Sequence, residues 1–213
     1  MNLCIAKPNK NCAIETFINN HIRYLHPAEI LCEGYFPWLF EERPGTIFRF
    51  HLSNRYVKGT VRRLLPATFE KRYDNALARF LQEKSIQVVF AEYGPVGANI
   101  TRGCRIAGVP LLVIFHGFDA SDRETLAAYQ KGYRALFAYA TKIIAVSRPM
   151  REKLISLGAP VDKLCWNPYG VDTATFRPAA NQPADGDPVR LIFIGRLTYK
   201  KAPDLLISAF HLA

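Results

Sequence analysis

The sequence lacks the features that would place it within a membrane or among secreted and dinucleotide-binding proteins. Its longest apolar runs, such as Pro110 to Phe115, fall far short of the roughly 18 residues that a membrane-spanning helix needs. The amino terminus has no apolar core of signal-peptide length, so we expect a cytoplasmic protein. No G-x-G-x-x-G follows the first apolar run, which removes most of the support for a dinucleotide-binding loop.

Cysteine is scarce, and its distribution excludes the common disulfide and metal frameworks. The chain has 5 cysteines, with no C-x-x-C pair and no histidine at metal-ligand spacing: Cys4, Cys12, Cys32, Cys104 and Cys165. No nucleophile signature surrounds any of them. We therefore expect reduced core thiols and no bound metal.

What the sequence does contain is an alternation of short apolar runs and longer segments of helical period. This pattern is typical of parallel strands joined by helical crossovers. The predicted strands are Leu3–Ala6, Glu29–Cys32, Thr46–Phe50, Gln87–Ala91, Leu111–Phe115, Lys142–Val146 and Leu164–Trp166. The predicted helices are Glu15–Leu25, Phe69–Lys84, Val96–Ala107, Arg123–Tyr139 and Arg148–Leu157. Because the strands do not alternate between apolar and polar residues, we expect a doubly wound α/β sheet that is covered on both faces.

Capping signals predict several helix ends. Ser121 with Glu124 has the spacing of a capping box, and Ser147 can cap the helix that follows it. Gly108 and Gly158 stand where helices commonly end.

A change of composition predicts a domain boundary. The 213 residues correspond to about 1.4 domains at roughly 150 residues per domain. Residues 179–188 contain no large apolar side chain and indicate a linker. After it, Val189–Ile194 has the composition of a buried strand, and Pro203–Leu212 that of a helix with proline at its first position. We therefore expect a first domain over residues 1–178 and the beginning of a second over 189–213.

The loops that follow the strands are the first places to search for a ligand site, because doubly wound sheets bind ligands beyond the carboxyl ends of their strands. Pro8 to Phe17 is a polar turn into a helix, and Tyr169 to Asp172 is an unremarkable turn. In the loop His116 to Asp119, Gly117 allows close backbone approach, and Asp119 can orient the imidazole or accept a hydroxyl. A purely structural histidine is the alternative.

The loop from Gly195 to Ala202 carries a concentration of positive charge before a helix amino terminus. Arg196, Lys200 and Lys201 stand there, although the helix macrodipole favours cations at the opposite end. An anion would account for them, and a diphosphate suits one guanidinium and two ammonium groups. A solvated basic turn is the alternative.

Several segments occur in the order that is typical of the GT-B glycosyltransferases of family 4, and the chain resembles the amino-terminal portion of these enzymes. The segments are Ala145–Ser147, Asn167–Asp172 with Phe176–Pro178, and Phe193–Leu197 with Lys200–Pro203. Glu15–Ile18 and His116–Asp119 are similar to the subgroup that makes exopolysaccharide or colanic-acid-type polymers.

The resemblance implies a retaining hexosyl-type transfer from a nucleotide-sugar to a saccharide or lipid-linked saccharide, in cell-surface polysaccharide biosynthesis. The reaction would take place without metal or cofactor, between two Rossmann-like lobes. His116 and Asp119 would be catalytic, with His116 at the transferred sugar. The donor diphosphate would be held by Arg196 and Lys201, and the acceptor side lined by Asn11 and Glu15.

This chain departs from the family pattern in three places. Pro8 to Ala13 replaces the usual glycine-rich loop, and Lys201-Ala202 replaces a Lys-Gly pair. The paired-glutamate motif of the second lobe has no counterpart before Ala213. We therefore expect these 213 residues alone to be inactive.

Much of the net charge of +10 lies in one segment. Between Arg43 and Arg79 there are nine basic residues and only two acidic ones. Lys58, Arg62 and Arg63 lie beside an apolar helical stripe, an arrangement that suits an anionic membrane and predicts a peripheral position at the inner face of the cell membrane. A helix with a solvated basic face is the alternative.

A non-catalytic basic α/β module that binds nucleic acid or an anionic membrane is the competing function. Tyr56, Phe69 and Tyr73 could stack on bases. Because no nucleic-acid-binding motif is present, we expect no nucleic-acid partner.

Overall fold

The computed structural model describes most of the chain and divides it into two compact units. The described residues are 1–9, 15–32, 39–40, 66–178, 188–195 and 197–212. The first unit comprises Met1–Gly170 and the second Val171–Ala213.

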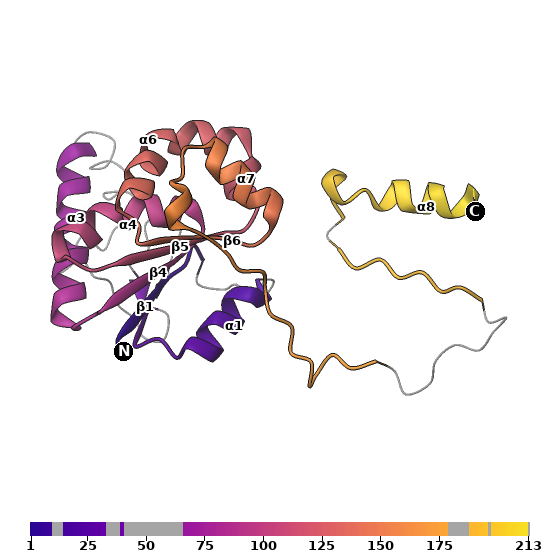
Figure 1. Cartoon of the computed structure of the whole chain (residues 1–213), viewed down its shortest axis with the longest axis horizontal. Helices are drawn as coiled ribbons and strands as arrows, with labels where there is room; N and C mark the ends of the chain where they lie inside the picture. Colours follow the sequence, from indigo (N-terminus) through magenta and orange to yellow (C-terminus); the bar gives the residue numbers. More distant parts are fainter. Residues whose placement is uncertain (10–14, 33–38, 41–65, 179–187, 196, 213) are drawn as a thin grey trace, which may run out of the picture. The chain divides into compact units, whose positions relative to one another are not determined.

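The first unit is built on a seven-stranded sheet with the strand order β3-β2-β1-β4-β5-β6-β7 (Figure 1). Every neighbouring pair is parallel except β2 and β3, which are antiparallel. The strands are β1 (Leu3–Ala6), β2 (Glu29–Cys32), β3 (Leu39–Phe40), β4 (Val88–Glu92), β5 (Leu111–Phe115), β6 (Lys142–Ala145) and β7 (Leu164–Trp166). Six of these confirm the sequence prediction. The short β3 was not predicted, and the predicted strand Thr46–Phe50 lies outside the described residues.

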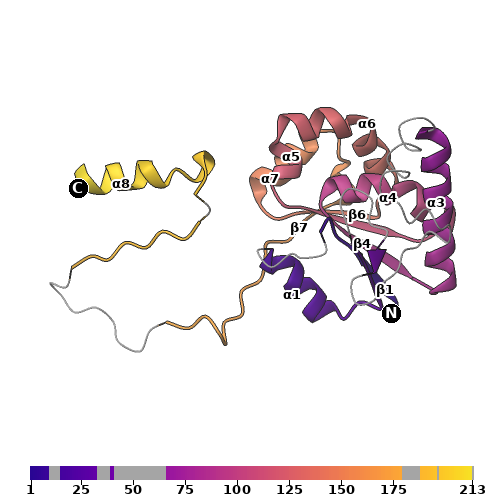
Figure 2. The ribbon, with the colours of Figure 1, turned by 180° about the vertical axis from the view of Figure 1, so that it is seen from behind.

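Helices cover both faces of this sheet, as predicted for a doubly wound fold. They are α1 (Thr16–Leu25), α3 (Pro66–Glu83), α4 (Gly94–Ala107), α5 (Phe118–Ser121), α6 (Arg123–Tyr139) and α7 (Arg148–Ser156), followed by the 3-10 turn η1 (Val161–Lys163). Figures 1 and 2 show α1 on one side of the sheet and α3, α4, α6 and α7 on the other.

The two sheet faces carry cores of different size. The larger core joins alternate strand residues such as Val89 and Val113 to Leu77 of α3 and Leu136 of α6. The smaller one consists of Leu3, Ile5, Phe90 and Ile114, and Ile22 of α1 packs against it. Successive strand residues point to opposite faces, so the continuous apolar runs in the sequence supply both cores.

Glycines let α4 approach its neighbours closely. A Cβ atom on Gly97 would lie 2.9 Å from Cγ2 of Val113 on β5. A Cβ atom on Gly103 would lie 2.6 Å from Cδ2 of Leu77 on α3. These two residues set the spacing of α4 from the sheet and from α3, so α4 is fixed firmly above β4 and β5.

Most of the predicted helix ends are confirmed. The Ser147 hydroxyl accepts a hydrogen bond from the Met150 N–H at 3.2 Å, and Gly108 and Gly158 have positive φ values of 71° and 94°. The predicted capping box at Ser121 is wrong. Ser121 belongs to the short helix α5, so the extended residue that a cap requires is Asp122, whose carboxylate accepts from the Thr125 N–H at 2.9 Å.

The strand order places a switch point between β1 and β4. The chain leaves β1 through α1 toward β2 on one side, whereas β4 pairs with β1 on the other side. A crevice beyond the carboxyl ends of the strands opens at such a point in doubly wound sheets. The loops that follow β4, β5 and β7 all begin at the carboxyl edge of the sheet.

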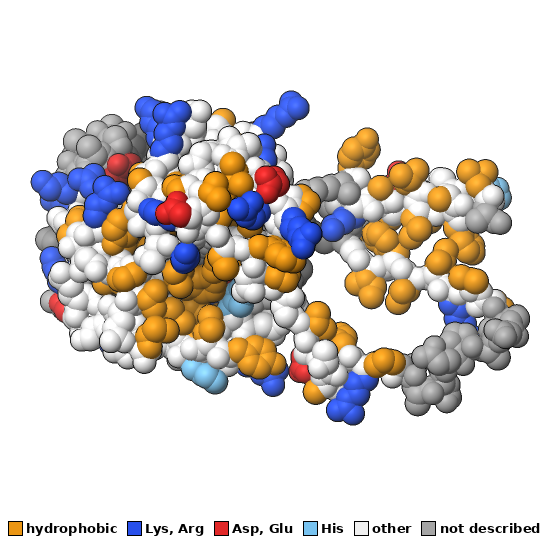
Figure 3. All heavy atoms as spheres, in the orientation of Figure 1, with side chains coloured by type: hydrophobic (Ala, Val, Ile, Leu, Met, Phe, Trp, Pro, Cys, Tyr) orange, Lys and Arg blue, Asp and Glu red, His pale blue; other side chains and the backbone are white. Residues whose placement is uncertain are grey.

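The second unit contains the 3-10 turn η2 (Tyr199–Lys201) and the predicted helix α8 (Pro203–Leu212). The predicted strand Val189–Ile194 is wrong, because these residues have no regular structure and Ile192 and Ile194 are 83% and 87% exposed. A strand needs a hydrogen-bonding neighbour, and the described residues of this unit include no other strand. Figure 3 shows the apolar side chains of this segment and of α8 on the surface.

The remaining general predictions concern membranes and thiols. Among the described residues, no helix is both long enough and apolar enough to cross a bilayer. Cys4, Cys32 and Cys104 are buried and Cys165 is exposed. Burial raises the pKa of Cys104 to about 12, which keeps this core thiol protonated at neutral pH.

Candidate functional site

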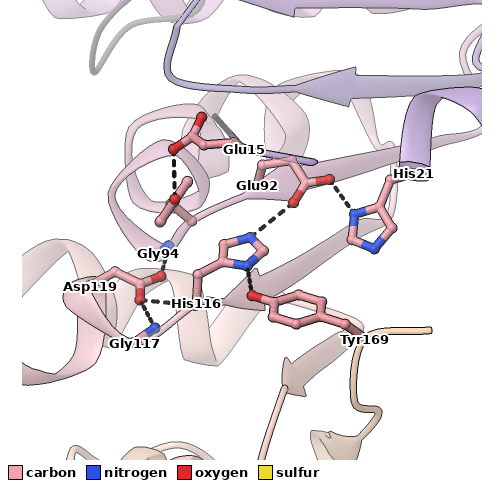
Figure 4. A network of polar contacts seen from close by, with 9 residues as sticks. Glu15, His21, Glu92, Gly94, His116, Gly117, Asp119 and Tyr169 are labelled. Atoms are coloured by element: carbon pink, nitrogen blue, oxygen red, sulfur yellow. Dashed lines mark hydrogen bonds and ion pairs between the residues drawn. The ribbon is translucent and has the colours of Figure 1, made fainter. Parts of the chain in front are cut away.

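A network of polar side chains lies at the carboxyl ends of β4, β5 and β7 (Figure 4). Glu92 ends β4, His116 follows β5, and Tyr169 follows β7. The helix α1 contributes His21, and Glu15 precedes its first turn. Segments far apart in the sequence therefore meet at the switch point of the sheet.

The side chain of His116 is almost completely buried by its neighbours. Its Nε2 lies 2.9 Å from Oε2 of Glu92, and its Nδ1 contacts the hydroxyl of Tyr169. The Phe17 ring stacks on the imidazole with a centroid distance of 4.4 Å. As a result the His116 side chain is only 3% exposed, while Tyr169, which covers it, is 39% exposed.

Glu92 is the centre of the network. Its carboxylate is fully buried, and its second oxygen, Oε1, lies 2.7 Å from Nδ1 of His21. Burial by itself would raise the pKa of Glu92, but hydrogen bonds from His116 and His21, together with electrostatic attraction to them, outweigh burial and lower this pKa below 4.5. The resulting stabilisation is present above pH 4.5 and is lost as the pH falls through the lowered value.

Sequence reasoning missed Glu92 and His21. Glu92 ends the apolar run of β4, where it looks like a residue that merely closes a strand. His21 fits the polar positions of an amphipathic helix. A carboxylate at the carboxyl end of a buried parallel strand is the one signal that could have identified Glu92, because ligands bind beyond this end of such strands.

Asp119 shapes the loop that carries His116. Its side chain is buried, and its Oδ1 accepts hydrogen bonds from the backbone N–H groups of His116 at 3.0 Å and Gly117 at 2.9 Å. Its Oδ2 accepts from the Gly94 N–H at 3.0 Å. Burial raises the pKa of Asp119, and these N–H donors oppose that shift. Asp119 thus orients His116 through the backbone rather than through the imidazole.

Glu15 and Tyr93 form the other side of the network. The Tyr93 hydroxyl donates to Oε1 of Glu15 at 2.7 Å. The second oxygen of Glu15, Oε2, is buried and has no hydrogen-bond partner among the described residues. Tyr93 has φ 78°, a conformation that non-glycine residues adopt at a cost of about 1–3 kcal/mol and that is concentrated at functional sites. Its ring packs against His116 at 4.4 Å.

The structure brings three of the predicted site residues together: Glu15, His116 and Asp119. Lys201 lies in the second unit, where it is exposed at the end of η2. The next residue, Ala202, has φ 45°, the left-handed conformation that favours the glycine found in the family pattern. Five predicted residues lie outside the described part of the chain: Asn11, Lys58, Arg62, Arg63 and Arg196.

The arrangement provides hydrogen-bond acceptors. In the part of the chain that the structure describes, no group of three or more His, Cys, Asp or Glu side chains could hold a metal ion. Buried carboxylate oxygens beside aromatic rings and a helix amino terminus suit a ligand rich in hydroxyl groups.

The family model described as glycosyltransferase family 4 matches residues 14–175. The chain belongs to this family. The family 4 chain is similar to the amylovoran biosynthesis glycosyltransferase AmsK of Erwinia amylovora, which is 30% identical over 173 residues, covering 78% of this chain and 39% of AmsK. A putative colanic acid biosynthesis glycosyltransferase, WcaL of Escherichia coli, is 30% identical over 187 residues, covering 81% of this chain and 45% of WcaL. The chain therefore spans less than half the length of either curated relative.

Solved structures agree on the fold of the family 4 chain. Anabaena HepE in complex with UDP and glucose has a TM-score of 0.52 and 13% identity, covering 84% of this chain and 47% of HepE. The lipopolysaccharide outer core galactosyltransferase WaaB has a TM-score of 0.52 and 14% identity, covering 86% of this chain and 51% of WaaB. These likenesses confirm the Rossmann-like α/β lobe that the sequence predicts.

Replacing Asp119 with alanine would leave three backbone N–H groups of the family 4 site without their acceptor. We expect the free energy of unfolding to fall by about 3 kcal/mol or more, because each of three buried donors left unpaired costs about 1–3 kcal/mol. Chemical denaturation monitored by circular dichroism measures the change.

The matched control is Asp122→Ala, three residues further along the chain. It removes a helix cap and is expected to cost about 1 kcal/mol. Equal losses in the two variants would contradict the assigned role of Asp119.

Proposed function

We propose that the protein containing this chain is a retaining glycosyltransferase that moves a hexose from a nucleotide-sugar to a saccharide or lipid-linked saccharide. The observation that carries the proposal is the family 4 match over residues 14–175 together with a site at the carboxyl edge of the sheet. The relatives AmsK and WcaL, named for amylovoran and colanic acid biosynthesis, favour a role in cell-surface polysaccharide biosynthesis. The proposal invokes no metal and no cofactor.

The first unit would supply the acceptor side of the reaction, together with contacts to the transferred sugar. The Tyr169 hydroxyl contacts Nδ1 of His116, and Tyr169 is exposed. A sugar hydroxyl would take the place of the Tyr169 hydroxyl at this nitrogen. Oε2 of Glu15, for which the described residues supply no partner, would accept a hydrogen bond from a hydroxyl of the acceptor sugar. Asn11 would line the same side, and Asp119 would hold the His116 loop in its shape.

The donor diphosphate would be bound by Arg196 and Lys201 in the second unit. As the glycosidic bond breaks, negative charge grows on the leaving phosphate oxygen, and fixed cations stabilise this state more than the ground state. A guanidinium can grip the phosphate bidentately, and an ammonium adds a point charge.

Replacing Arg196 with alanine should lower kcat for sugar transfer by roughly 100- to 1,000-fold, because deletion of one such donor commonly costs that much. The assay uses the protein at its full encoded length, a panel of UDP-hexoses and a polyprenyl-linked saccharide acceptor. Arg190→Ala is the control, since Arg190 is exposed in the same unit. An unchanged kcat for Arg196→Ala would remove Arg196 from the site, and absence of transfer with every donor would refute the proposed activity.

We also propose that the protein acts at the inner face of the membrane through its basic segment. The support is the charge of that segment and the lipid-linked acceptors of the proposed reaction. Each basic residue near an anionic surface contributes about 1 kcal/mol. The three candidates, Lys58, Arg62 and Arg63, lie beside the apolar helical stripe predicted for this segment.

Replacing these three residues together with glutamine should reduce binding to vesicles of anionic phospholipid by roughly 100-fold, because three such contacts are lost. Cosedimentation at moderate salt measures the loss. The control is the same change at Lys131, Arg134 and Lys153, which are exposed on α6 and α7. Binding to single-stranded DNA but not to vesicles would favour the nucleic-acid module instead.

A further inference from the structure

The carboxylate of Glu92 has no part in the proposed transfer, yet it lies at the centre of the site. It is fully buried, and it separates two imidazoles that come from different elements, His21 on α1 and His116 after β5. A buried carboxylate costs free energy unless it is fully hydrogen-bonded. Its two contacts, at 2.7 Å and 2.9 Å, meet that requirement.

These two contacts determine where the protons of the imidazoles lie. An ionised carboxylate can only accept hydrogen bonds, so the ring nitrogen that faces it must carry a proton. When both imidazoles are neutral, Nε2 of His116 and Nδ1 of His21 are therefore the nitrogens that carry the proton and donate to Glu92. The other nitrogen of His116, Nδ1, is then unprotonated and accepts from the Tyr169 hydroxyl.

We propose that Glu92, itself anchored by His21, is a positioning residue that holds His116 in a single tautomer and a single ring orientation. The consequence for catalysis rests on the proposed function, in which a sugar hydroxyl takes the place of Tyr169 at Nδ1. With Nε2 engaged by Glu92, Nδ1 of the neutral imidazole presents its lone pair to that hydroxyl. The opposite tautomer would present an N–H at Nδ1 and would favour a hydrogen-bond acceptor at that position.

The remaining contacts of His116 hold its backbone and the plane of its ring. Asp119 holds its backbone N–H at 3.0 Å. Phe17 and Tyr93 pack on the ring with centroid distances of 4.4 Å each. Backbone, ring plane and ring protonation are thus set by different residues, and only Glu92 among the described contacts selects the tautomer.

The histidine tautomers can be observed directly by long-range ¹H–¹⁵N NMR on the ¹⁵N-labelled chain at pH 8. We expect His116 to be protonated at Nε2 and His21 at Nδ1 in the unmodified protein. The chain has 5 histidines, so single substitutions suffice to assign the signals. A proton on Nδ1 of His116, or rapid exchange between its two tautomers, would overturn the proposal without any variant having to fold.

Glu92→Gln tests the cause. Glutamine has one acceptor oxygen and one donor amide, so it can accept from only one imidazole and must donate to the other. We expect one of the two imidazoles to exchange its tautomer or lose its fixed N–H signal. His21→Asn is the conservative variant, because its amide nitrogen stands the same number of bonds from the backbone as Nδ1 and can still donate to Glu92. We expect it to leave the His116 signals unchanged, and His26→Asn, on an exposed residue outside the network, to do the same.

The transfer assay separates this inference from the proposed function. We expect Glu92→Gln to lower kcat by about tenfold or more, because His116 is then no longer held in one tautomer and orientation, while His26→Asn, outside the network, retains the rate. An unchanged kcat in a Glu92→Gln protein with altered tautomers would refute the catalytic role of the positioning. Failure of the unmodified protein to transfer any sugar would instead refute the proposed function and leave the NMR result intact.

Discussion

The candidate site depends on one buried carboxylate. Glu92 stands at the end of a central strand and is bound by imidazoles from α1 and from the loop after β5. A buried charge that loses its partner is strongly destabilising, so the position of each partner is constrained by the other. The constraint matters most for α1, because the apolar core beneath this helix is the smaller of the two. The position of α1 beside the carboxyl edge of the sheet therefore depends on a polar contact as much as on packing.

The other polar contacts of the site extend this arrangement. Asp119 connects the loop after β5 to the start of α4 through Gly94. The Tyr93 hydroxyl connects the same region to Glu15 at the start of α1. The strained backbone of Tyr93 is thus held between two elements that the sheet already fixes. One carboxylate oxygen in this network, Oε2 of Glu15, has no hydrogen-bond partner within the described part of the chain.

Much of the fold was predictable from the sequence, because buried parallel strands have continuous apolar runs and helix ends carry local signals. The strands β1, β2, β5 and β7 begin and end where the sequence predicts. The polar network of the candidate site was harder to predict from the sequence. Glu15, His116 and Asp119 lie in segments that follow predicted strands, where doubly wound sheets bind their ligands. Glu92 and His21 lie within regular elements, and only the three-dimensional pairing of β1, β4 and β5 brings them together. Local sequence also misled at Val189–Ile194, since strand formation depends on a partner that composition does not reveal.

The central claim is that the carboxyl edge of the first unit binds the sugar substrates. Amide NMR of the chain, titrated with methyl glycosides and disaccharides of glucose and galactose, tests it most directly. We expect shifts at Tyr93, Gly117 and Tyr169, which lie at this edge. Gly108 and Gly158 precede β5 and β7 at the opposite edge and should not shift. Shifts confined to the opposite edge, or none at any saccharide concentration, would contradict the account.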